Sequence, residues 1–295
     1  MDYDNDGDLD VLSGSYTGEI YLFERDEDGN LAQGRFLVAS DGKPLVTGTS
    51  VTPEAVDVDA DGDLDLVIGT RTSGAYVVEN SGTRSAPSWA PKPRRLKTAK
   101  GTRIKGSNAH HADWDGDGLR DLVVGSEWGE AAWYRNVGSN NKPKYGDRTV
   151  LIPRRKFVEI DAGTTPTDPG SRTKVHVTDY NGDGRVDLLV GDVQWHWKTL
   201  TPLTPEKKLE KKAFRPKYKA AKDAYFKVVE ERNSFVGRKG GIPKDVLDRY
   251  RKASEIFRPF QIQMASYDRR RSETHGFVWV YLRKQKTVAS KPVKN

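Results

Sequence analysis

The chain has 295 residues, enough for one large domain or two ordinary ones, and 31% of its residues are charged. It contains no cysteine, which excludes disulfides and cysteine-ligated metals, and no apolar run of roughly 18 residues, which excludes a membrane-spanning helix. The net charge of +7 hides a segregation, because 17 of the 42 acidic residues fall into four short clusters within an otherwise basic chain. This distribution is not typical of a nucleic-acid-binding protein.

The four acidic clusters are copies of one motif. They read DYDNDGDLDVLSG from Asp2, DVDADGDLDLVIG from Asp57, DWDGDGLRDLVVG from Asp113 and DYNGDGRVDLLVG from Asp179. The shared pattern is D-x-D/N-x-D-G-x-x-D, followed by a short apolar run and a glycine, and the copies begin 55, 56 and 66 residues apart. Internal repetition at this spacing is typical of propellers, solenoids and arrays.

The motif has the chemistry of a calcium-binding loop. Oxygens at positions 1, 3 and 5 converge in a tight turn, the glycine at position 6 permits a positive φ, position 7 offers a carbonyl, and the aspartate at position 9 closes the cage. It is not an EF-hand, because Ile68 and Val124 stand where a position-12 glutamate would fall. The alternative, a turn that binds nothing, leaves several carboxylates repelling one another.

The sequence therefore predicts up to four Ca²⁺ sites. The candidate ligands are Asp2, Asp4, Asp6, Asp10, Asp57, Asp59, Asp61, Asp65, Asp113, Asp115, Asp117, Asp121, Asp179, Asn181, Asp183 and Asp187. We expect the fourth site to be the weakest, because Asn181 removes one charge.

Each loop lies between two short predicted strands. The strand before the loop is expected at 52–59, 108–115 and 173–180, and a short apolar strand follows each loop. An aromatic-rich strand comes next, at 18–25, 74–80, 129–136 and 276–283, and a looser fourth strand lies near Phe36, Leu96 and Val150. Four antiparallel strands in each repeat predict an all-β fold made of four propeller blades.

These repeats resemble the FG-GAP or VCBS repeat of integrin-α-type calcium-binding β-propellers, over nearly the whole chain except 198–275. The resemblance implies the fold and the calcium, but no particular activity, because the fold hosts adhesion proteins, lectins and some lyases and lipases. Propellers of this type usually have more than four blades, and the first repeat lacks the strand before Asp2. We therefore expect an arc of C-terminal blades, partnered by further blades of a longer, N-terminally extended protein.

The fourth repeat carries an insertion, since Gly191 and Gly276 are 85 residues apart. A helix start is predicted at Thr204, a break or restart at Pro216, and a second helix start at Pro243. The domains expected are therefore blades in 1–197, a basic αα-hairpin in 198–275, and a closing strand with a tail in 276–295. The insertion holds 21 Lys and Arg against 10 Asp and Glu, which indicates either an anionic partner or the solvated face of amphipathic helices.

The turns between the second and third strands lie on the rim opposite the acidic loops. They hold the candidate ligand-binding residues Tyr16, Arg71, Trp128, Trp195, His196 and Trp197. Flat aromatic rings bind sugars and anchor protein interfaces, although Trp195 and Trp197 could equally be strand residues that anchor the insertion. In integrin-like propellers this rim is the usual partner surface, so the resemblance implies the same here.

Three acid–base candidates, Glu54, His110 and His176, each stand three residues before a complete loop, and repeat symmetry places them at equivalent points. Two functions stay open. The first is a calcium-binding scaffold that recognises carbohydrate or protein, expected outside the cell or in the periplasm because such loops suit millimolar calcium. The second is a polysaccharide-active lyase or hydrolase built on the same propeller.

Overall fold

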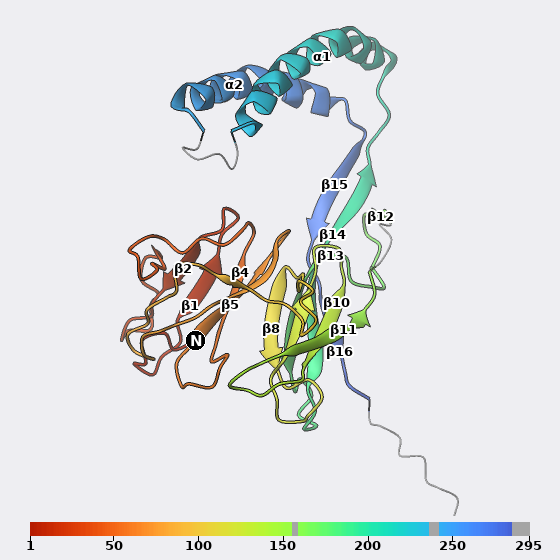
Figure 1. Cartoon of the computed structure of the whole chain (residues 1–295). Coiled ribbons are helices and arrows are strands. Elements are labelled where there is room, and N and C mark those ends of the chain that lie inside the picture. The colour runs from red at the N-terminus through yellow and green to blue at the C-terminus, as the bar shows by residue number, and fades with distance from the viewer. Residues whose placement is uncertain (155–158, 236–241, 285–295) are drawn as a thin grey trace, which may run out of the picture. The chain divides into compact units, whose positions relative to one another are not determined.

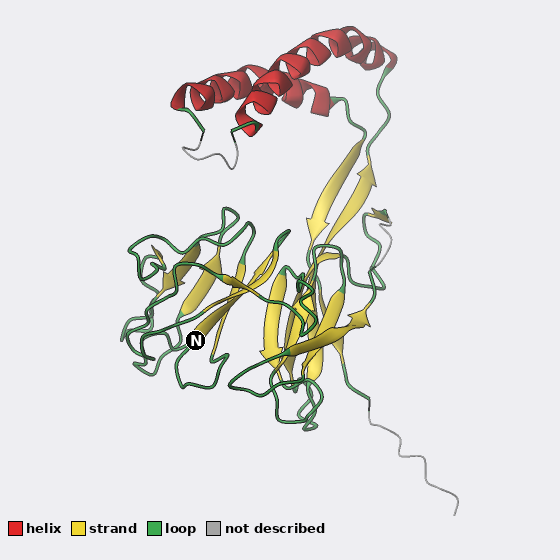
Figure 2. Cartoon of the chain, in the orientation of Figure 1, coloured by secondary structure: helices red, strands yellow, loops and turns green. Residues whose placement is uncertain are grey.

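The computed structural model describes residues 1–154, 159–235 and 242–284, and the chain divides into two compact units. The sheet unit comprises Met1–Val158, Thr165–Gln194 and Thr274–Asn295, and the helical unit comprises Glu159–Thr164 and Trp195–Glu273. Figure 1 labels the elements, and Figure 2 shows strands dominating the first unit and helices the second. Within the described ranges, no helix is long and apolar enough to cross a membrane.

The first three sheets follow one another along the chain as antiparallel meanders (Figure 1). The first sheet contains β1 (Val11–Gly14), β2 (Ile20–Phe23) and β3 (Arg35–Phe36). The second contains β4 (Thr52–Val56), β5 (Asp65–Thr70), β6 (Gly74–Val78) and β7 (Arg94–Arg95). The third contains β8 (Asn108–Ala112), β9 (Asp121–Gly125), β10 (Ala131–Asn136) and β11 (Tyr145–Ile152). The second and third sheets thus have the predicted four strands, with the acidic loop between the first and second.

The first sheet has one extra pairing in place of a full innermost strand. The amino group of Met1 donates to the carbonyl oxygen of Asp10 at 3.0 Å, and the Asp10 amide donates to the Met1 carbonyl at 2.7 Å. In the second sheet the same register joins Val56 to Asp65. Met1 therefore occupies the last position of the strand that the other sheets have before their loops.

The fourth sheet is built around one long strand, β14 (Asp187–Thr199). Within the sheet unit β14 pairs with β13 (Ser171–Thr178) on one side and β16 (Val278–Tyr281) on the other. Farther along, it also pairs with β12 (Ile160–Asp161) and β15 (Arg270–His275). The predicted insertion accordingly lies between β14 and β16.

The cores of the sheet unit lie between successive sheets. Leu66 of β5 belongs to a buried cluster shared with Ile20 of the first sheet, whereas the next residue, Val67, belongs to a cluster shared with Leu122 of the third. A further cluster joins the third sheet to the fourth through Val123. Because both faces of β5 are buried, its apolar run is continuous and does not alternate with polar residues.

The helical unit contains the expected αα-hairpin of α1 (Pro205–Asn233) and α2 (Lys244–Ser266). The Thr204 hydroxyl caps α1 by accepting the Lys207 amide. The predicted break at Pro216 is wrong, because α1 continues through this residue. A proline inside a helix costs about 3 kcal/mol or more. Aromatic packing against α2 on both sides of it offsets that cost. The Phe214 ring lies 5.9 Å from that of Phe260, and the Tyr218 ring lies 5.6 Å from that of Phe257.

Candidate metal centres

Each acidic loop ends in a buried aspartate whose two carboxylate oxygens both accept backbone amides. These aspartates, at position 9 of the motif, are Asp10, Asp65, Asp121 and Asp187. One oxygen accepts the amide at position 2 of the same loop at 2.7–3.2 Å. The other oxygen accepts a backbone amide at 2.6–2.8 Å from a residue at, or two residues beyond, the end of the aromatic-rich strand of the same sheet, which is β2, β6, β10 or β16. We call this arrangement the aspartate staple, because it ties the loop to its sheet by hydrogen bonds alone.

The staple of the second loop is electrostatically costly. Desolvation raises the pKa of Asp65 to about 6, although the two amides that it accepts favour the ionised form. The staple recurs in all four repeats with the same partners in the same order. The position-9 aspartates therefore have a structural role that the sequence pattern, which assigned them to the metal cage, does not reveal.

The loops themselves are wound as the motif predicts. The position-6 glycines Gly7, Gly62, Gly118 and Gly184 have φ angles of 100°, 97°, 84° and 82°. This left-handed conformation is strained for any residue with a Cβ. In the last two loops the first aspartate, Asp113 or Asp179, accepts three amides of its own loop, which closes the turn around the carboxylates.

Carboxylates converge in three of the four loops. The converging groups, each with ligand atoms within 4.8 Å of one another, are Asp2, Asp4 and Asp6; Asp57, Asp59 and Asp61; and Asp113, Asp115 and Asp121. In the part of the chain that the structure describes, the fourth loop forms no such group. The structure thus brings together the predicted residues at positions 1, 3 and 5 in the first two loops, and at positions 1, 3 and 9 in the third.

The first two loops contain buried carboxylate oxygens without a hydrogen-bond partner among the described residues. They are the Oδ1 atoms of Asp2, Asp8, Asp59 and Asp63. The side chains of Asp8 and Asp63, at position 7, were missed by the sequence analysis, which gave that position only a backbone carbonyl. Desolvation, together with the charges of neighbouring aspartates, raises the pKa of Asp59 and Asp63. Among the described residues, no salt bridge reaches the carboxylates of these two loops, so their negative charge is only weakly compensated.

The last two loops already contain a cation from the protein. Arg135 contacts Asp115 at 2.7 Å and Asp117 at 2.8 Å, and Arg185 pairs with Asp183. The Leu119 amide and Arg135 hold the pKa of Asp117 below its usual range. Loops of nearly the same sequence thus differ in the charge left for an external ion.

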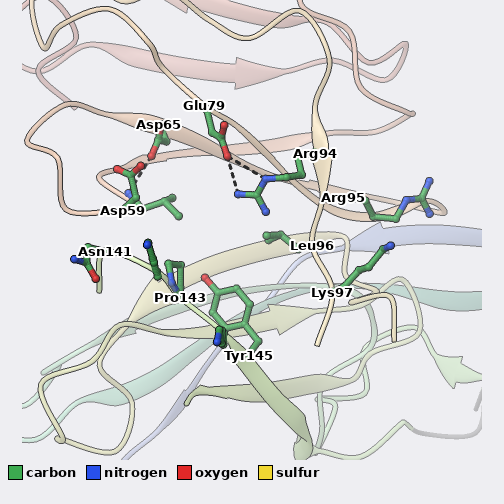
Figure 3. Close-up of a pocket in the computed structure, with 13 residues that line it drawn as sticks. Asp59, Asp65, Glu79, Arg94, Arg95, Leu96, Lys97, Asn141, Pro143 and Tyr145 are labelled. Carbon is green, nitrogen blue, oxygen red and sulfur yellow. Dashed lines mark hydrogen bonds and ion pairs between the residues drawn. The ribbon is translucent and has the colours of Figure 1, made fainter. Parts of the chain in front are cut away.

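A pocket of about 520 Å³ opens beside the second loop, between the second and third sheets (Figure 3). Asp59 and Asp65 lie at one end, and Arg95 and Lys97 lie toward the other. Glu79 accepts two hydrogen bonds from Arg94 within it, at 2.8 and 3.0 Å. The pocket therefore reaches the second acidic loop at Asp59.

The three acid–base candidates come together across neighbouring sheets. Glu54 of β4 contacts Nδ1 of His110 on β8 at 2.7 Å, and the His110 ring lies 4.5 Å from that of His176 on β13. Although burial opposes it, the hydrogen bond that His110 donates to Glu54 raises the pKa of His110. Burial, followed by the charge of His110, lowers the pKa of His176. The cluster therefore pairs a carboxylate with an imidazole whose protonated form it favours, beside a second imidazole whose protonated form is disfavoured.

The candidate ligand-binding residues divide between the two units. Tyr16 and Trp128 are 72% and 60% exposed on turns of the sheet unit, and Arg71 contacts Glu127, the neighbour of Trp128, at 2.6 Å. Backbone hydrogen bonds join these turns, from the Ser50 amide to Tyr16 and from the Arg71 amide to Thr49. The turns of the first three sheets therefore form one continuous rim.

Trp195, His196 and Trp197 belong to the helical unit and lie within β14, not in a turn. His196 is buried opposite Ile160 of β12, and the Trp197 ring lies 4.8 Å from the guanidinium of Arg270. Their packing is that of strand residues at the base of the hairpin.

The fold and the loops together define a repeat protein of antiparallel sheets, stacked face to face, each with an acidic loop at the same place. The model of the FG-GAP-like repeat matches residues 2–68 and 113–190, which include all four loops. The chain carries FG-GAP-like repeats over these regions, and repeats of this kind imply that its sheets are propeller blades. Among curated proteins, no sequence matches it significantly.

Proposed function

We propose that the protein is a calcium-stabilised propeller module that serves as a binding scaffold. The unpartnered buried oxygens of the first two loops carry this proposal. A buried carboxylate oxygen without a partner is costly, and a hard divalent cation is the partner that several such oxygens share best. In these loops the aspartates at positions 1, 3, 5 and 7 would hold the ion, while position 9 keeps the loop in shape.

The last two loops are proposed as weaker sites. Asp113 and Asp115, which converge with Asp121, would act in the third together with Asp117, and Asp179, Asn181 and Asp183 would act in the fourth. There an entering ion competes with Arg135 or Arg185 for the same oxygens. The order of affinity would then follow the uncompensated charge, from the first two loops to the fourth.

The ions would be structural. A cation that binds only the folded loop adds its binding free energy to the stability of the fold. Extracellular calcium modules have dissociation constants of about 10⁻⁴–10⁻³ M, which suits an extracellular or periplasmic location.

We further propose that the rim carrying Tyr16, Arg71 and Trp128 is the ligand-binding face. The exposure of two aromatic rings on one continuous rim supports this, because such rings stack on sugars and anchor protein contacts. Carbohydrate is tested with a glycan array, on which Trp128→Ala should lose the signal that the wild type gives. If no glycan binds, the carbohydrate ligand is rejected.

Calcium binding is tested with a matched pair of substitutions at position 3. We expect calcium at 100 times its dissociation constant to stabilise the wild type by about 2.7 kcal/mol per site relative to EDTA, measured by thermal unfolding. Asp59→Ala should lose the calcium-dependent stabilisation that one strong site contributes, whereas Asn181→Ala should lose little of this stabilisation. Equal melting of the wild type in calcium and in EDTA would reject the proposal.

A further inference from the structure

The blades of this protein stack in one fixed polarity. On the second sheet, Val67 and Val77 point toward the third sheet, and we call the side that they define the forward face. Leu66 and Val78 point toward the first sheet and define the backward face. The three cores of the sheet unit all place the forward face of one sheet against the backward face of the next.

The forward face of the fourth sheet is apolar but exposed. The register places Leu189 opposite Val280 and Gly191 opposite Val278, as it places Val67 opposite Val77 and Gly69 opposite Ala75 in the second sheet. Val278 and Val280 are 70% and 39% exposed. The equivalent residues of two other sheets are at most 1% exposed. They are Ala75 and Val77 in the second sheet and Ile20 and Leu22 in the first. This face thus has the apolar composition of a buried face, and no sheet among the described residues covers it.

The first sheet has the complementary free surface, a backward face. Val11 pairs with Phe23, and Tyr21 pairs with Phe36, on the side of the sheet opposite to Ile20 and Leu22. The rings of Tyr21 and Phe36 lie 4.7 Å apart, and Val11 and Phe36 are each 40% exposed. In the second sheet, the equivalent Leu66 and Val78 are completely buried.

We infer that the forward face of the fourth sheet binds the backward face of the first sheet of a second copy of this chain. The contact would repeat the polarity of the three internal cores and bury Val278 and Val280 against Val11 and Phe36. Because two different faces meet, the association is head to tail. The contact does not involve the acidic loops and stands independently of the proposed calcium binding.

The test uses one acidic substitution on each face. The full chain is examined by sedimentation velocity and light scattering from about 1 to about 100 µM, a range suited to a micromolar contact. The wild type should associate with increasing concentration, whereas Val278→Asp and Phe36→Asp should each stay monomeric. Leu209→Asp, an equally exposed apolar position on α1, is the control and should associate as the wild type does.

Mixing the two variants tests the polarity. Each has one intact face, so an equimolar mixture should form 1:1 dimers and nothing larger. A wild type that stays monomeric throughout the range overturns the inference. The inference is also overturned if Val278→Asp or Phe36→Asp self-associates as strongly as the wild type, provided that the melting temperature of the variant shows it to be folded.

The variant Gly191→Ala distinguishes the proposed partner from a different protein surface bound to the same face. The first sheet has no described strand before Met1, so the proposed contact leaves Gly191 clear, and Gly191→Ala should associate normally. Loss of association in Gly191→Ala would show that the neighbour brings an innermost strand, and the first sheet of a second copy would then be the wrong partner.

Discussion

The second and fourth sheets carry the same motif in different surroundings. In both, the last aspartate of the loop, Asp65 or Asp187, is buried and accepts two amides. In the second loop, Asp59 and Asp63 keep unpartnered oxygens, whereas Asn181 and Arg185 occupy the corresponding positions of the fourth. The repeat therefore preserves the frame of the loop, and the few residues that differ decide how much charge is left for a metal.

The two sheets also differ at their faces. A Cβ added to Gly69 would lie 2.5 Å from the backbone of Asn108 in the third sheet, whereas a Cβ on Gly191 would meet nothing closer than 3.9 Å. The same motif glycine thus stands in both strands, but among the described residues only Gly69 has a neighbouring sheet packed against it. Packing, rather than the local sequence, makes the glycine necessary.

The largest effect is expected at the aspartate staple, where the two sheets should behave alike. Asp65→Ala and Asp187→Ala each leave two buried amides without an acceptor, and we expect each to lower the free energy of unfolding by about 4 kcal/mol. The losses should be similar in calcium and in EDTA, measured by urea denaturation. Asp65→Asn keeps one acceptor and should lose less. A loss that disappears in EDTA would show that Asp65 acts mainly through a metal.

The glycines should separate the two sheets. Gly69→Ala forces its methyl group into the backbone of the third sheet, and overpacking of this kind costs about 1–3 kcal/mol. Gly191→Ala has space for its methyl group and should change stability by less than about 0.5 kcal/mol. Urea denaturation of both variants tests the contrast, and equal losses would contradict it.

The last prediction concerns His110 of the third sheet, which contacts Glu54 of the second sheet and lies beside His176 of the fourth. Because Glu54 raises the pKa of His110, the folded state holds this proton more tightly, so the stabilisation is complete below about pH 6.5 and is lost as pH rises through the raised pKa. Glu54→Gln should therefore cost about 2 kcal/mol near pH 6 and about 1 kcal/mol near pH 8.5. Urea denaturation at both pH values provides the test. A larger cost at the higher pH would reject the assignment of the proton to His110.

The sequence was sufficient for the features that repeat. Four copies of one motif predicted the strands and the left-handed glycines, because those depend on neighbours within the same repeat. It was not sufficient for contacts between distant segments. Arg135 reaches the third loop from β10, and Asp8 and Asp63 lose their solvent only when the loop folds. Pro216 shows the same limit in the helical unit, since packing with α2 overrides a local helix breaker.

The aspartate staple has a consequence for a protein exposed to changing calcium levels. Hydrogen bonds, and not the ion, hold the two ends of each loop, so a loop that gives up its ion under the proposed binding retains its outline. Reloading would then need only diffusion of the cation and no refolding. Depletion would therefore weaken such a protein gradually and reversibly, one site after another.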